Sequence, residues 1–304
     1  MRFQLFKMFE SRTSELTEEE FRKILHTKCK DFVKSPKLLQ RSKTSEGSEF
    51  SYINPKSFDR APLKKSDRFT DGVESRHHTL LMDNLPSWKD FPKRSQSVIG
   101  LTSEDSKVIF GFHRYLIIPF DNAKFGVAPS ADLWGCQLKD DLIKTPSEWD
   151  GVWTPSRRIS FNDRFSNMMI NSEISDTSYQ EMISDLQKLY DKYLKSGKLL
   201  FESFDFSKTP NGLEVLFFTI KENNFKNIQD GLSFLFKPEY FNGTDIDEQN
   251  GFQVMNWKYL SSLGNYETYE FWTDSECLLW YIGKALPFFD IEEAYQSFIS
   301  DFIH

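Results

Sequence analysis

Three separated parts of the chain carry polar side chains that follow apolar, strand-like residues. Arg41 follows two leucines, Thr102 and Ser103 end an apolar segment, and Glu270 lies in the aromatic segment 266–272. A guanidinium binds phosphate groups with fixed geometry, and a carboxylate stabilises positive charge that develops during a reaction. Hydroxyl groups on a neighbouring strand can hold such an acid in place. These side chains suit chemistry on an anionic substrate, provided that the fold brings them together.

Hydrophobic periodicity predicts the elements that must position these side chains. A capping box at Thr17 and apolar residues at helical spacing predict a helix over about 17–34, which Ser35-Pro36 ends. Apolar runs bounded by turn residues predict strands at 38–41, 97–103, 115–119, 124–128 and 213–220. An extended segment with a turn near Asp274 is expected over 269–282. Further helices are expected at 179–194, 225–236 and 291–303.

Short strands joined by turns favour a largely antiparallel sheet, and the added helices predict an α+β fold. Residues 42–78 are polar and are expected to form a long irregular crossing. We expect an N-terminal helical segment over 1–35, a β core from 36–130 and 252–304, and a mixed insertion over 131–251. The insertion could carry target recognition.

Composition excludes several classes of protein. The 304 residues include three cysteines that lie far apart, so we expect core thiols, with neither a disulfide framework nor a zinc site. His77 and His78 have no carboxylate cluster nearby, and no metal is expected. The chain begins without a signal-peptide pattern and has no stretch approaching the roughly 20 apolar residues that span a bilayer. We therefore expect a cytoplasmic protein without a membrane partner.

Charge is unevenly distributed along the chain, although its net value is −7. Residues 34–94 contain 13 Lys/Arg and 8 Asp/Glu, whereas residues 95–304 contain 18 and 31. A local positive field is what an anionic cofactor or a nucleic acid requires, and a solvated loop region is the other explanation.

In their order and strand contexts, Arg41, the segment 101–103 and Glu270 resemble the motifs of the ADP-ribosyltransferases of the Arg-Ser-Glu class. Those enzymes place an arginine on the first core strand, a Ser-Thr-Ser-like motif on a later strand, and a catalytic glutamate opening a strand further on. The resemblance covers about 36–130 and 252–282. It implies an ADP-ribosyltransferase-like split antiparallel β core that uses NAD as a substrate.

The resemblance implies a role for each matching residue. Glu270 would stabilise the oxocarbenium-like ribose formed when the bond to nicotinamide breaks. Arg41 would bind the pyrophosphate of NAD, and Thr102 and Ser103 would orient the glutamate and the ribose. Further residues are expected near NAD: Trp88 to gate the nicotinamide, Lys93 and Arg94 to clamp a phosphate, and Arg76.

Alternatives remain open for several of these residues. The segment 88–94 could instead be a packed loop, and Arg60 and Arg76 are rivals of Arg41 for the pyrophosphate. Leu101 stands where the family has its first serine. On a strand, Glu267 and Glu270 would lie on opposite faces. Members that modify arginine have Glu-x-Glu, so arginine is not the expected acceptor.

The resemblance implies transfer of ADP-ribose to a macromolecule, either a protein side chain or a nucleic-acid base. The base is an option because aromatic residues interleave the basic block. Similar proteins of bacteria and phages are toxins or effectors, so an antitoxin or other inhibitor is an expected partner. The alternative is a non-enzymatic interaction protein that binds its partner through an aromatic surface. The aromatic residues of 288–302 are expected in the core, with a partner-binding face as the alternative.

Overall fold

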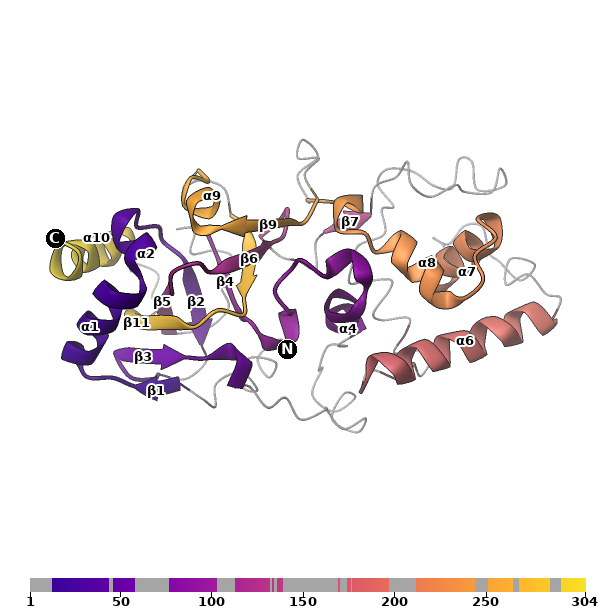
Figure 1. The fold of residues 1–304 in the computed structure, drawn as a ribbon, viewed down its shortest axis with the longest axis horizontal. Coiled ribbons are helices and arrows are strands. Elements are labelled where there is room, and N and C mark those ends of the chain that lie inside the picture. Colours follow the sequence, from indigo (N-terminus) through magenta and orange to yellow (C-terminus); the bar gives the residue numbers. More distant parts are fainter. Residues whose placement is uncertain are drawn as a thin grey trace. The chain divides into compact units, whose positions relative to one another are not determined.

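The computed structural model describes the following residues: 13–43, 46–57, 77–102, 113–131, 133, 136–138, 169, 174–175, 177–196, 212–243, 251–264, 268–284 and 291–304. The chain divides into two compact units (Figure 1). Unit 1 comprises Met1–Val73, Phe91–Ala131 and Gln253–His304, and unit 2 comprises Glu74–Asp90 and Asp132–Phe252.

Unit 1 contains an antiparallel sheet, and the fold is α+β, as predicted. Nine strands of the described residues are hydrogen-bonded in the order β1-β3-β11-β5-β2-β4-β10-β6-β9. The strands are β1 (Thr13–Glu15), β2 (Gln40–Lys43), β3 (Phe50–Ile53), β4 (Val98–Leu101), β5 (His113–Pro119), β6 (Lys124–Val127), β9 (Gln253–Asn256), β10 (Glu270–Thr273) and β11 (Cys277–Lys284).

The sheet has a weak junction between β2 and β4. These two strands share a single registered pair, Gln40 with Leu101. By contrast, β5 is registered with β2 over four pairs and with β11 over seven. The nine strands are therefore one hydrogen-bonded sheet in which two groups of strands meet at one residue pair.

Helices of unit 1 cover this sheet. They are α1 (Glu18–Lys28), α2 (Lys30–Lys34), α9 (Trp257–Ser261), α10 (Ile291–Phe302), and the 3-10 helices η2 (Pro55–Ser57) and η4 (Arg94–Gln96). The capping box is confirmed, because the Thr17 hydroxyl accepts the Glu20 N–H at 3.2 Å and the Glu20 carboxylate accepts the Thr17 N–H at 2.9 Å. The helix predicted over 17–34 is interrupted at Cys29, where φ is −120° and ψ is 38°.

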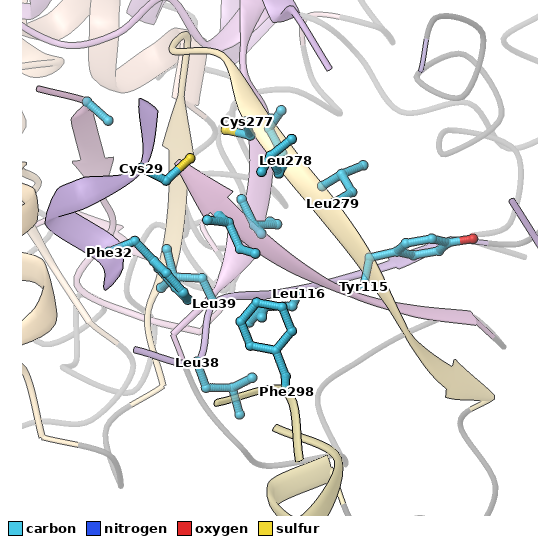
Figure 2. Close-up of a cluster of buried hydrophobic side chains, with 14 of the residues drawn as sticks. Cys29, Phe32, Leu38, Leu39, Tyr115, Leu116, Cys277, Leu278, Leu279 and Phe298 are labelled. Carbon is cyan, nitrogen blue, oxygen red and sulfur yellow. The ribbon is translucent and has the colours of Figure 1, made fainter. Parts of the chain in front are cut away.

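Much of the core of unit 1 is aromatic, as the composition suggests. Phe298 of α10 packs on Trp280 of β11 at a centroid distance of 4.8 Å and contacts Phe21 of α1 at 6.4 Å. Figure 2 shows Phe298 with aliphatic side chains of the neighbouring strands. Over 291–302 the aromatic face of α10 is core, as predicted, because Phe298 is fully buried and Phe302 is 8% exposed.

The cysteines belong to the cores of their units. All three are buried free thiols, as expected. Figure 2 places Cys29 and Cys277 within the buried cluster of unit 1. Burial raises the pKa of the Cys277 thiol, and the charge of Arg41 acts in the opposite direction.

Unit 2 is mainly helical in its described part. Its elements are α4 (His77–Asn84), η3 (Pro86–Trp88), α6 (Tyr179–Ser196), α7 (Gly212–Glu222), α8 (Ile228–Leu235), η12 (Pro238–Tyr240), and a two-stranded pairing of β7 (Gln137–Leu138) with β8 (Phe241–Asn242). Residues 74–90, which we expected in the NAD-binding core, group with this unit. The Nε2 atom of His77 in α4 lies within hydrogen-bonding distance of the carbonyl oxygens of Ile174 (3.1 Å) and Ser175 (3.0 Å).

Two local predictions were wrong. Residues 213–220 form most of helix α7 instead of a strand, because a short and largely apolar run carries no period that separates helix from strand. The segment 42–78 was expected to lack regular structure, yet it contains β3. Strand β3 has only four residues, and both of its partners, β1 and β11, lie outside that segment. His77 and His78 are buried residues of helix α4.

The other predicted helices and strands are confirmed with small shifts. The helices at 179–194, 225–236 and 291–303 correspond to α6, α8 and α10, and the extended segment 269–282 forms β10 and β11 around a turn. The strand predicted at 38–41 begins two residues later, at Gln40. None of the helices in the described ranges is long and apolar enough to cross a membrane.

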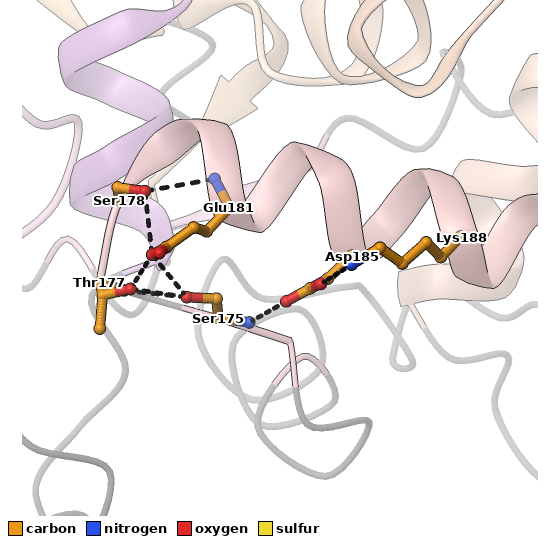
Figure 3. Close-up of polar contacts among 6 residues, drawn as sticks. All are labelled: Ser175, Thr177, Ser178, Glu181, Asp185 and Lys188. Atoms are coloured by element: carbon orange, nitrogen blue, oxygen red, sulfur yellow. Dashed lines mark hydrogen bonds and ion pairs between the residues drawn. The ribbon is translucent and has the colours of Figure 1, made fainter.

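A cluster of hydroxyl groups caps the first turn of α6 (Figure 3). The Glu181 carboxylate accepts hydrogen bonds from the hydroxyls of Thr177, Ser178 (3.0 Å) and Ser175 (3.3 Å). The Glu181 N–H donates to the Ser178 hydroxyl at 3.2 Å. These bonds, that of Thr177 foremost, lower the pKa of Glu181, whereas burial and the charge of Asp185 act in the opposite direction. A carboxylate at a helix N-terminus also interacts favourably with the helix dipole.

We predict that Glu181→Gln lowers the unfolding temperature at pH 7 and that this difference disappears in acid. A lowered pKa means that the stabilisation is present above the unfolded value of about 4.3 and is lost as pH falls through the folded value. Thermal unfolding of both proteins between pH 3 and pH 7, followed by circular dichroism, measures the difference. Glu222→Gln, at an exposed position of α7, is the matched control and should not show this pH dependence. A Glu181→Gln difference that is constant over this range would contradict the prediction.

Candidate active site

The residues singled out by the sequence come from three neighbouring strands of unit 1. In the sheet, β4 lies between β2 and β10. Leu101 of β4 is the register partner of both Gln40 and Glu270, so these three residues form one row across the strands. Arg41 and Thr102 are each adjacent in sequence to a member of this row. The fold therefore gathers segments that are more than 160 residues apart in the chain.

Thr102 fixes the backbone at the entry to β10. Its N–H donates to the Tyr269 carbonyl at 3.0 Å, and its hydroxyl accepts the Tyr269 N–H at 3.0 Å. Thr102 is 2% exposed, so this pair of bonds is sheltered from water. The hydroxyl thus acts on the residue directly before Glu270. Ser103 lies outside the described residues.

Glu270 is the first residue of β10 and is held from both sides. Beyond its pairing with β4, its carbonyl accepts the Ala128 N–H at 2.8 Å, and its N–H donates to the Ser130 carbonyl at 2.8 Å. The Glu270 side chain is 10% exposed. The carboxylate is therefore nearly buried on a rigid backbone, which is the setting that preorganised electrostatic groups require.

An ion pair joins this carboxylate to Arg94. The Arg94 Nη1 atom lies 2.7 Å from the Glu270 Oε1 atom, and the arginine side chain is 7% exposed. Breaking a buried pair by removing one partner commonly costs about 3–5 kcal/mol, because the other charge is left uncompensated. We had expected Arg94 to clamp a phosphate of NAD. The structure places its guanidinium on the Glu270 carboxylate.

Trp272 forms the wall beside this ion pair. It lies two residues after Glu270 on β10, so both side chains leave the same face of the strand. Its indole N–H donates to the Pro92 carbonyl at 2.9 Å, its ring stacks with Phe91 at 6.0 Å, and Arg94 lies 5.5 Å from its ring centroid. The fully buried Trp272 therefore links the segment 91–94 to β10.

Gly126 makes room for the indole. A Cβ atom at this position would lie 2.2 Å from Cε2 and 2.3 Å from Cζ2 of Trp272. Gly126 is the register partner of Trp272 on β6, and no larger residue fits there without moving the ring.

Arg41 is also buried, but the register places it differently. It is 5% exposed and pairs with Tyr115 of β5, one position along from the Gln40 and Leu101 pair. Successive residues of a strand point to opposite faces, so regular alternation directs Arg41 away from the row that contains Glu270. The structure thus brings Arg94, rather than Arg41, to the carboxylate.

Among the remaining predicted residues, the structure describes Trp88 and Lys93. Trp88 belongs to unit 2, where its indole N–H donates to the Phe236 carbonyl at 2.6 Å and its ring lies 5.0 Å from that of Phe252. Lys93 is exposed, and its carbonyl receives the Ser97 hydroxyl at 2.7 Å. Three residues lie outside the described residues: Arg60, Arg76 and Glu267.

Glu267 and Glu270 were expected on opposite faces of one strand. Strand β10 begins at Glu270, and Thr268 and Tyr269 before it are not part of a strand. Alternation along a strand therefore does not assign Glu267 to the opposite face.

Sequence reasoning missed Trp272, Phe91 and Gly126. Trp272 had a usable signal, since a residue two positions after a catalytic candidate on a strand shares its face. Gly126 had none, because only the tertiary pairing of β6 with β10 reveals what a side chain there would meet.

Comparisons of the chain with protein-family models, with curated proteins and with solved structures find no match. Within the described parts of the chain, no three His, Cys, Asp or Glu side chains group as a metal site. Functional assignment therefore depends on the arrangement around Glu270.

We predict that Gly126→Ala destabilises unit 1 by about 1–3 kcal/mol, the usual range for overpacking a core. In a Trp272→Phe background the penalty should be smaller, because phenylalanine lacks the indole nitrogen and the fused ring. Chemical denaturation of the four proteins of this double-mutant cycle measures the coupling. Equal penalties in both backgrounds would show that Trp272 is not what excludes a side chain at position 126.

Proposed function

We propose that this protein transfers ADP-ribose from NAD to a macromolecular acceptor, with unit 1 as an ADP-ribosyltransferase-like core. The observation that carries the proposal is the strand order β2-β4-β10. In this order the strands that carry Arg41 and Glu270 lie on either side of β4, which Thr102 follows directly. The single residue pair between β2 and β4 also supports a core divided into two groups of strands.

The proposed reaction exchanges one bond at C1′ of the ribose. The bond from C1′ to the nicotinamide nitrogen breaks, and its electron pair leaves with nicotinamide. An acceptor nucleophile forms the new bond to C1′ and releases its proton. The ribose carries positive charge between these events, and the Glu270 carboxylate stabilises that charge more in the transition state than in bound NAD. The proposal has the ribose approach the tenth of the Glu270 side chain that is exposed.

The pyrophosphate of NAD requires a guanidinium, and three arginines of the basic block are candidates: Arg41, Arg60 and Arg76. Arg41 lies on the strand beside β4, although its row points away from Glu270. Calorimetric titration of NAD into the three Arg→Lys variants identifies the ligand, because lysine keeps the charge and loses the planar fork. Arg22→Lys, on α1, is the control for a general effect of the substitution.

The acceptor is a protein side chain or a nucleic-acid base, and arginine is disfavoured by the spacing of Glu267 and Glu270. By its resemblance to bacterial and phage toxins or effectors, the protein would act in the cytoplasm and would be restrained by an antitoxin or other inhibitor. Incubation with labelled NAD and cell lysate, followed by separate protease and nuclease digestion, names the acceptor class. Failure to bind or consume NAD at high protein concentration would favour a non-enzymatic interaction protein.

We predict that Glu270→Gln lowers kcat for ADP-ribose transfer by on the order of 10²–10³, the usual effect of losing one preorganised electrostatic group. The amide keeps the size of the side chain and removes its negative charge, so NAD affinity should change much less than turnover. Glu276→Gln, at the turn before β11, is the matched control and should keep its activity. A folded Glu270→Gln protein that modifies its target at the parental rate would refute the proposed function.

A further inference from the structure

The ion pair of Arg94 with Glu270 is buried, so it is not an exposed surface ion pair. Exposed ion pairs contribute little to stability, and placing two charges inside a protein is unfavourable unless their geometry is well satisfied. Here 7% of the Arg94 side chain and 10% of the Glu270 side chain are exposed, and the two charged atoms are 2.7 Å apart. The surrounding residues must therefore maintain this geometry.

Four contacts attach the segment that carries Arg94 to one face of β10. Phe91 stacks on Trp272 with an interplanar angle of 17°, the Pro92 carbonyl accepts the indole N–H, and Arg94 contacts both Trp272 and Glu270. The Trp272 ring fills the space above Gly126 of β6, so its position is fixed on that side as well. The position of the Arg94 backbone is thus set by a fully buried indole.

Hydrogen bonds also hold the segment 91–94 on its C-terminal side. The Lys93 carbonyl accepts the Gln96 N–H at 2.9 Å and the Ser97 hydroxyl at 2.7 Å, and β4 begins directly afterwards at Val98. If Arg94 had to leave the Glu270 carboxylate during catalysis, the segment that carries Arg94 would have to move. Contacts on both sides of Arg94 hold this segment in place, which suits a residue that stays on the carboxylate.

We propose that Arg94 is a positioning residue, which holds the Glu270 carboxylate through Oε1 so that Oε2 faces the ribose of NAD. The inference rests on the proposed function, and it replaces the expectation that Arg94 binds a phosphate of NAD. A carboxylate accepts about four hydrogen bonds, so contact with Arg94 leaves acceptor capacity for the sugar. The neighbouring guanidinium compensates the buried charge and fixes the rotamer of the acid.

The test is the steady-state kinetics of Arg94→Gln and Arg94→Lys with NAD and the acceptor. We expect kcat of Arg94→Gln to fall by on the order of tenfold to a hundredfold, because small misplacement of a catalytic group reduces rate by such factors. The dissociation constant of NAD should change by less than about threefold, since no binding contact is removed. Arg94→Lys should recover part of kcat, because it restores the charge without the planar fork.

A double-mutant cycle separates positioning from a general structural role. If Arg94 acts through the acid, Arg94→Gln should have little further effect on the residual kcat of Glu270→Gln. Arg22→Gln is the matched control, since Arg22 also pairs with a glutamate, Glu18 at 2.7 Å, and contacts an aromatic ring, Phe302 at 4.1 Å. Its kcat should equal that of the parent protein.

Each other outcome has a definite meaning. Unchanged kcat in Arg94→Gln, or multiplicative losses in the cycle, would overturn the positioning role. Unchanged kcat with a weaker NAD affinity would make Arg94 a phosphate ligand. If Arg94→Gln fails to fold, Arg94→Lys carries the test, and full activity of a folded Arg94→Lys would overturn the requirement for a guanidinium. Absence of NAD turnover by the parent protein would refute the proposed function itself, and this inference with it.

Discussion

The candidate site depends on the register at Leu101, which pairs with Gln40 on one side and with Glu270 on the other. The side-chain period of a strand is two, so a slip by one residue would move every side chain of β10 to the opposite face. Such a slip would place Phe271 where Glu270 now meets Arg94. The fully buried Phe271 packs 5.9 Å from Phe125, which ties the register of β10 to the hydrophobic core.

The same constraint explains how two charges are tolerated inside unit 1. Burial of Phe271 on one face of β10 directs Glu270 and Trp272 to the other. Trp272 then anchors the segment that supplies Arg94, so a countercharge meets the carboxylate. A carboxylate whose orientation is already fixed needs no reorganisation when positive charge develops beside it, which is the main advantage of a preorganised electrostatic group. Packing and electrostatics are therefore coupled through one short strand.

Much of this architecture could be predicted from local patterns. The capping box at Thr17, the amphipathic pattern of α6 and α10, and the turn between β10 and β11 depend on residues close in sequence. The prediction failed where local patterns are ambiguous. Helix α7 was predicted as a strand because the run 213–220 is short and largely apolar, and β3 was missed because its partners lie far away in the chain.

The sequence by itself determined the α+β class, the core thiols, most helices, and the glutamate on which the functional proposal depends. Only the tertiary structure decided which arginine meets that glutamate. Residue type alone does not distinguish the arginines of the basic block 34–94, which include Arg41, Arg60, Arg76 and Arg94. The pairing of β2 with β5 sets the row in which Arg41 lies. The packing of Trp272 against Gly126 positions the segment whose Arg94 lies 2.7 Å from Glu270. These are contacts between distant segments, and no local pattern encodes them.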